Sequence, residues 1–120
     1  MSPADQTRRE ADQREAHCGA LPEEMLAGMV QAQRLRDAAL ASAVVQAADE
    51  TGGPVVVITG SGHARRDTGV PAMLARAAPD LSVLSVGQLE ADPGPDAPYD
   101  LWIITPPTPR DDPCAGLTGD

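Results

Sequence analysis

The run Val55-Val56-Val57-Ile58 most constrains what this chain can fold into. Four successive β-branched residues with no polar residue between them are typical of a strand buried on both faces of a parallel sheet. Thr51-Gly52-Gly53-Pro54 precedes the run and ends any helix before it, and a glycine-rich loop from Gly60 to Gly69 follows it. We therefore expect an α/β fold in which residues 55–58 are a strand.

Two helices and two further strands are expected around this strand. Pro22-Glu23-Glu24 predicts the start of a long helix that runs to about Glu50, and Val70-Pro71 begins a short helix through about Ala78. The apolar residues at 81–86 and 101–104 predict the other strands, the first of which completes a βαβ unit. The expected fold class is a three-layer, mostly parallel sheet flanked by helices. Because three strands make only about half of such a sheet, we expect an incomplete or dimeric domain.

Composition excludes several classes of partner. The chain has 120 residues, so it can form one small domain, and with no Phe, one Trp and one Tyr its core is thin. Its net charge of −9 disfavours nucleic acid and anionic membranes. No apolar run approaches the roughly 20 residues of a membrane span.

The N-terminal residues are the most polar part of the chain. Residues 1–16 contain no large apolar residue after Met1, and they are expected to be a leader, helical or disordered, with fraying favoured. They also lack the apolar core of an export signal, so we expect no signal peptide. The domain itself is expected to occupy residues 17–120.

The long helix interrupts its own apolar face. With about 100° per residue, one arc of this helix carries its large apolar residues, and the same arc includes Gln33, Arg36 and Asp37. Buried polar groups need hydrogen-bond partners. The three residues therefore form either a structural network of Arg36 with Asp37 or a surface that faces a ligand. The apolar members of the arc are Met25, Leu26, Met29, Val30, Leu40, Val44, Ala47 and Ala48.

The loop after the first expected strand carries His63 and Arg65. The carboxyl end of a parallel strand is where open α/β sheets usually bind ligands. Thr59-Gly60-Ser61-Gly62 precedes His63, but the loop is neither a dinucleotide fingerprint nor a phosphate-binding loop. His63 is therefore either a structural histidine or a functional one that shares a crevice with Arg65.

The two cysteines leave three alternatives open. Cys18, which follows His17, and Cys114 are either joined in a disulfide, free, or part of a metal site with His63. Zinc sites usually contain short C-x2-C pairs, which this chain lacks. A disulfide would indicate an oxidising compartment.

The motifs, taken in order, resemble the ChaN-like haem-binding lipoproteins, which share a superfamily with the Tiki proteases and erythromycin esterases. His17-Cys18, Leu21-Pro22, Met25, Met29 and Ala32-Gln33 with Arg36-Asp37 are similar to the family's helix motif. Ile58-Thr59-Gly60-Ser61-Gly62-His63-Ala64-Arg65, Gly69-Val70-Pro71 and Asp112-Pro113-Cys114 resemble its later blocks. The resemblance covers residues 17–114 and implies the C-terminal half of a domain about twice this length.

This resemblance implies haem binding linked to bacterial iron or haem uptake at the cell envelope. A homodimer or a complementing N-terminal half are the implied partners. Within that expectation, His63 and His17 are candidate imidazole ligands and Tyr99 is a candidate phenolate. Arg36 or Arg65 would contact propionates. Besides Tyr99, the expected haem contacts are His63, Arg65, His17, Met25, Met29, Gln33, Arg36 and Asp37.

Two other functions compete with haem binding. One is a metal-dependent hydrolase, as in the superfamily's enzymes, with His63 and His17 near the metal and Asp37 or Glu90 as base. The other is a truncated half-domain without activity. Because the acidic and histidine motif of the family's earlier half is missing, the expectation is a binding protein rather than an enzyme.

Overall fold

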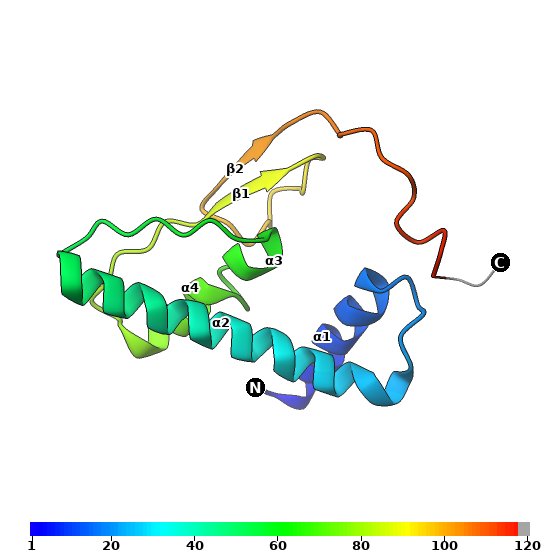
Figure 1. The fold of residues 1–120 in the computed structure, drawn as a ribbon, viewed down its shortest axis with the longest axis horizontal. Coiled ribbons are helices and arrows are strands. Elements are labelled where there is room, and N and C mark those ends of the chain that lie inside the picture. The colour runs from blue at the N-terminus through cyan, green and yellow to red at the C-terminus, as the bar shows by residue number, and fades with distance from the viewer. Residues whose placement is uncertain (118–120) are drawn as a thin grey trace. The chain divides into compact units, whose positions relative to one another are not determined.

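The computed structural model describes residues 1–117, which divide into two compact units. The first unit comprises residues 1–35 and 109–117, and the second comprises residues 36–108. The long helix α2, Glu23–Thr51, contributes its N-terminal part to the first unit and the rest to the second (Figure 1).

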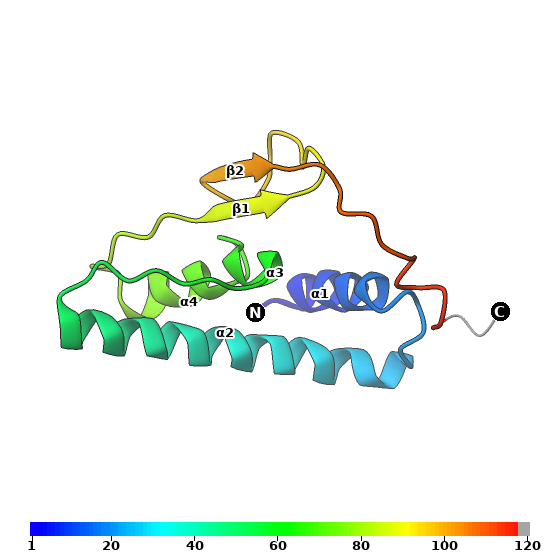
Figure 2. The ribbon, with the colours of Figure 1, turned by 45° about the horizontal axis from the view of Figure 1, so that its top comes forward.

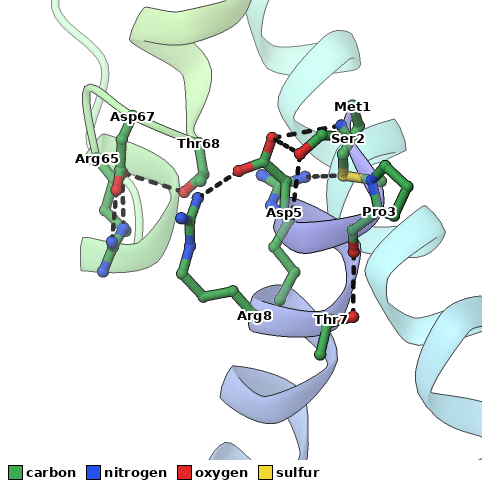
Figure 3. A network of polar contacts seen from close by, with 10 residues as sticks. Met1, Ser2, Pro3, Asp5, Thr7, Arg8, Arg65, Asp67 and Thr68 are labelled. Carbon is green, nitrogen blue, oxygen red and sulfur yellow. Dashed lines mark hydrogen bonds and ion pairs between the residues drawn. The ribbon is translucent and has the colours of Figure 1, made fainter.

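The first unit begins with helix α1, Pro3–Ala16, where fraying was favoured. Ser2 caps this helix: its Oγ accepts a hydrogen bond from the Asp5 backbone N–H at 3.1 Å, and the Asp5 carboxylate accepts from the Ser2 backbone N–H at 3.3 Å (Figure 3). Pro3 occupies the first turn, where its missing N–H costs nothing. None of the residues of α1 is buried. The helix is therefore stabilised by its cap and by polar side-chain pairs. Because it has no apolar face, the hydrophobic pattern of the sequence did not predict it.

The long helix α2 confirms the prediction for residues 22–50. It ends at Thr51, and the Gly52 N–H donates to the Ala48 carbonyl at 2.8 Å with Gly52 at a φ of 77°. This left-handed residue closes the helix because glycine adopts that conformation without strain. Leu26 and Val30, one turn apart, are only 1% exposed. Met25 was expected on the same buried face but is 49% exposed, because it lies about 100° around the helix from Leu26, away from the line of Leu26 and Val30.

The core of the second unit lies between α2 and the short helix α4, Val70–Ala77, which confirms the prediction for 70–78. Ala41 of α2 packs with Val70 and Leu74, and partly buried neighbours surround them: Leu40, Val44, Val45, Met73 and Leu81. A four-residue helix, α3, Ser61–Ala64, lies within the expected glycine-rich loop. Helices α3 and α4 lie between the C-terminal part of α2 and the strands (Figure 2).

The strands form a two-stranded parallel sheet, which together with the helices is consistent with the expected α/β class. Strand β1, Val86–Leu89, pairs with β2, Leu101–Ile104, in register from Val86–Leu101 to Leu89–Ile104. The prediction for 101–104 is confirmed. The prediction for 81–86 was wrong by several residues, because Leu81 belongs to the helical core and Ser85 is taken up by hydrogen bonds before β1 begins.

The strand predicted at residues 55–58 was wrong. Residues 52–60 have no regular secondary structure, and in the described part of the chain no hydrogen bond reaches the backbone of residues 55–59. Ile58 is 96% exposed. A β-strand needs hydrogen bonds to a neighbouring strand, and this β-branched run has no such neighbour among residues 1–117. The expected βαβ unit is therefore not formed.

Candidate functional site

The second unit joins two residues that the sequence singled out separately. His63 Nδ1 lies 2.6 Å from Asp37 Oδ1, across 26 positions of sequence. Asp37 is only 3% exposed, and the side chain of His63 retains 23% of its exposure. Of the two alternatives for these polar residues, the network of Arg36 with Asp37 is not formed among the described residues, because Asp37 bonds to His63 of α3 and Arg36 is exposed.

This pair fixes the chemistry of the imidazole. An ionised carboxylate only accepts hydrogen bonds. The Nδ1–H group of His63 therefore donates this hydrogen bond, and the Asp37 carboxylate accepts it. A neutral ring then carries its lone pair on Nε2. Nε2 has no hydrogen-bond partner among residues 1–117. It is not one of the buried side-chain atoms of these residues that lack a partner, so it is not shut off from solvent. The Nε2 atom of His63 is therefore a nitrogen ligand of fixed orientation. Metal-binding histidines are commonly held in this way, by a carboxylate at the other ring nitrogen.

The two arginines expected near His63 differ in their engagement. The Arg65 guanidinium donates twice to the Asp67 carboxylate, at 2.9 and 2.7 Å (Figure 3). These hydrogen bonds lower the pKa of Asp67 below its ordinary value. Arg36 is exposed, and no hydrogen bond or ion pair within the described residues engages its side chain. Of the two, Arg36 is thus the more available cation for a carboxylate ligand.

The remaining expected contacts, from His17 after α1 and from the N-terminal part of α2, lie in the first unit. His17 Nδ1 is 2.8 Å from the Gln13 carbonyl, so a second imidazole also has its Nδ1 engaged. Met29 and Gln33 are half-buried, and Met25 is exposed. These four residues and the pair of His63 with Asp37 belong to different units.

Tyr99 and Glu90 are both engaged within the second unit. The Tyr99 hydroxyl donates to the Ser61 carbonyl at 3.1 Å. In this structure the Tyr99 hydroxyl is therefore engaged with α3. Glu90 accepts a hydrogen bond from the Thr108 backbone N–H at 3.4 Å.

The cysteines form one covalent link. Cys18 and Cys114 are joined in a disulfide, with their Cα atoms 5.5 Å apart. Both lie in the first unit, where the link fastens residues 109–117 to the segment between α1 and α2. Within residues 1–117, no three His, Cys, Asp or Glu side chains gather as ligands of a metal ion.

A separate groove lies between α2 and α4. It has a volume of about 770 Å³, and neither Asp37 nor His63 lines it. Its walls are mostly small or apolar side chains, among them Ala38, Ala41, Ser42, Val45 and Met73. It contains no imidazole or carboxylate–imidazole pair, so we place the candidate site at His63 rather than at the groove.

Asp100 stabilises the chain around His63. Its carboxylate accepts a hydrogen bond from the Ser85 backbone N–H at 2.7 Å and forms an ion pair with the Arg66 guanidinium. The Ser85 hydrogen bond, aided by Arg66, lowers the pKa of Asp100 below its ordinary value of 3.8. A folded-state pKa below the unfolded one means that this stabilisation is present above the unfolded pKa and is lost as pH falls through the folded pKa.

Substitution of Asp100 by Asn tests this pH dependence. We expect the thermal stability of the native chain to exceed that of Asp100→Asn at pH 7, with the difference narrowing as pH falls below about 4. Thermal unfolding of both proteins, followed by circular dichroism from pH 7 to pH 2.5, measures it. A difference that stays constant over this range would show that the carboxylate charge of Asp100 is not what stabilises the fold.

A known protein family matches the part of the chain that contains Asp37 and His63. A family model described as "Haem-binding uptake, Tiki superfamily, ChaN" matches residues 1–74, more than half of the chain, and includes both Asp37 and His63. The chain belongs to this haem-binding family. No curated protein and no solved structure matches the chain.

The side chains of this ChaN family member include the groups that haem needs from a protein. Haem iron takes a neutral imidazole nitrogen as an axial ligand, and its propionates take cations. His63 offers such a nitrogen with its other ring nitrogen held by a carboxylate, and Arg36 offers a cation that no side chain of residues 1–117 pairs with. The donor set in the second unit therefore fits haem. None of the helices described in residues 1–117 is long and apolar enough to cross a membrane.

Proposed function

We propose that this chain binds haem through Nε2 of His63, as part of haem or iron uptake in bacteria. The observation that carries the proposal is the 2.6 Å hydrogen bond from His63 Nδ1 to the buried Asp37 carboxylate. It holds the ring in the tautomer that can ligate iron, and it fixes the direction of Nε2. Bound haem supplies an iron with axial positions that an imidazole can fill.

Arg36 is the second residue in the proposal. It precedes Asp37 on α2, it is exposed, and its guanidinium is without a partner in the described residues. A guanidinium pairs well with a carboxylate such as a haem propionate. Arg65 would have to share its guanidinium with Asp67, so we assign it a weaker part. The roles of His17, Met25, Met29 and Gln33 remain predictions from the resemblance.

We further propose that another polypeptide segment completes the fold. Val56 and Ile58 are exposed, and their backbone makes no hydrogen bond to any other residue in 1–117. Leu101 and Ile103 of β2 are exposed as well. Such apolar residues suit the interior of a larger, three-layer parallel sheet. A second copy or a complementing N-terminal half would supply it. The disulfide of Cys18 with Cys114 supports a place in an oxidising compartment such as the cell envelope.

Titration of the purified chain with haemin tests the binding proposal. We expect a saturable shift of the Soret band in the native protein, lost or at least tenfold weaker in His63→Ala. For Asp37→Asn we expect affinity to fall by about 10- to 100-fold, because the ring loses its supporting carboxylate. His17→Ala, which removes the other histidine, is measured in parallel, and its affinity should fall less than that of His63→Ala because the expected contact of His17 rests on the resemblance alone.

Two outcomes would contradict the proposal. A folded native chain that gives no saturable shift would show that this chain alone does not hold haem. Equal affinities of the native protein and His63→Ala would remove His63 from the site, and a loss confined to His17→Ala would move the ligand to the first unit.

A further inference from the structure

Helix α3, which carries His63, is too short to be stable by itself. It has four residues, and no side chain caps its N-terminus at Gly60. The first helical turn is costly to form because several residues must be fixed for one hydrogen bond. The direction of the His63 ring therefore depends on the groups that surround α3.

Two side chains from the strand region hold the carbonyls of α3. The Tyr99 hydroxyl donates to the Ser61 carbonyl at 3.1 Å, and the Ser85 hydroxyl donates to the Ala64 carbonyl. Ser85 directly precedes β1, and Tyr99 lies two residues before β2. A four-residue helix leaves its carbonyls without helical partners, so these donors satisfy groups that α3 cannot satisfy itself.

The position of Tyr99 is set in turn by Gly87 of β1. A Cβ atom at position 87 would lie 2.9 Å from two atoms of the Tyr99 ring. The absence of a side chain at Gly87 therefore lets the ring lie against β1. The turn is tied down further, because the Arg66 backbone N–H donates to the Pro98 carbonyl at 2.8 Å.

We propose that Tyr99 is a positioning residue for His63. By holding Ser61 at one end of α3, its hydroxyl keeps Nδ1 of His63 on Asp37, and so leaves Nε2 available to a ligand. Gly87 provides the space that this contact needs. The effect on haem affinity rests on the proposed function, whereas the effect on the His63 ring does not.

Two variants on different elements test this role. Tyr99→Phe removes only the hydroxyl, and Gly87→Ala displaces the ring. Thr105→Val is the matched control, because Thr105 of the same region donates its hydroxyl to a carbonyl, that of Leu89, at 3.5 Å without contacting α3. Thermal unfolding of all three variants measures their stability separately from the site.

The decisive readout is the tautomer of His63, measured from its imidazole nitrogen shifts by NMR in the haem-free chain. We expect the Nδ1–H form to lose population in Tyr99→Phe and in Gly87→Ala, while the same signals of His17 stay unchanged. Haemin affinity should fall by about 3- to 10-fold in both, the range of one lost hydrogen bond. Thr105→Val should change neither.

Three results would overturn the assignment. An unchanged His63 tautomer in folded Tyr99→Phe and Gly87→Ala would show that α3 is positioned without Tyr99. A uniform loss of stability with an unchanged tautomer would show a merely structural role. Loss of haemin binding in Tyr99→Phe with the tautomer intact would mean that Tyr99 contacts haem itself. If the native chain binds no haemin, the proposed function fails, and the NMR result still decides the positioning role.

Discussion

Gly69→Ala is expected to destabilise the second unit by about 3 kcal/mol or more, because there is no room for even one methyl group at this position. A Cβ atom on residue 69 would lie 2.3 Å from the His63 carbonyl oxygen and 2.8 Å from that of Arg65. Both are backbone atoms, so no flexible side chain can move aside. Gly69 is also the N-cap of α4, whose Val70 and Leu74 form the core. Relief of the clash must therefore displace either α3 or the core helix.

Denaturant unfolding of Gly69→Ala against the native chain measures this effect, with Gly62→Ala as the matched control. Gly62 lies inside α3 and has no atom within 4 Å of an added Cβ. Alanine there should be neutral or slightly stabilising, because it restricts the unfolded chain. Equal stabilities of the two variants would show that the contact of residue 69 with the His63 backbone does not exist in solution. A folded Gly69→Ala should also bind haemin more weakly.

The parts of the fold that the sequence predicted correctly carry their own local information. Helix α2 has prolines and glycines at its two ends, and α4 begins at Val70-Pro71. Strand β2 is a short apolar run that ends before Pro106. The strand at residues 55–58 was wrong because a strand also needs a neighbour, and composition says nothing about whether one is present.

The candidate site was predicted residue by residue but not as a pair. Asp37 stood out as a carboxylate in an apolar arc, and His63 stood out by its place after an expected strand. Their contact spans 26 positions, and only the packing of α3 near α2 brings them together. A buried carboxylate needs a hydrogen-bond partner, and the two histidines of the chain can supply one as well as its neighbour Arg36.

Other residues of the site have no sequence pattern that reveals their part. Ser85 was included in an expected strand, whereas its hydroxyl bonds to the Ala64 carbonyl. Gly87 was not singled out, and Tyr99 was predicted as a ligand rather than as a hydrogen-bond donor to Ser61. These roles depend on close approaches between segments far apart in sequence, which residue type alone does not specify.

Loss of the disulfide between Cys18 and Cys114 is expected to have the largest effect on stability. The bond joins residues separated by 96 positions. In the chain-entropy model, a link of this length restricts the unfolded chain by roughly 4 to 5 kcal/mol. The double variant Cys18→Ser/Cys114→Ser should therefore unfold about 15 °C below the oxidised chain. Residues 109–117 would then be covalently connected to the rest of the first unit only along the backbone, through residues 36–108.

The double variant and chemical reduction test the same link in two ways. Dithiothreitol should lower the unfolding temperature of the native chain to that of the double variant and leave the variant itself unchanged. Since Asp37 and His63 both lie in residues 36–108, haemin affinity below the unfolding transition should change little in the reduced chain. If reduction instead abolishes haemin binding while the second unit stays folded, the ligand set extends into the first unit, and His17 beside Cys18 becomes the next residue to replace.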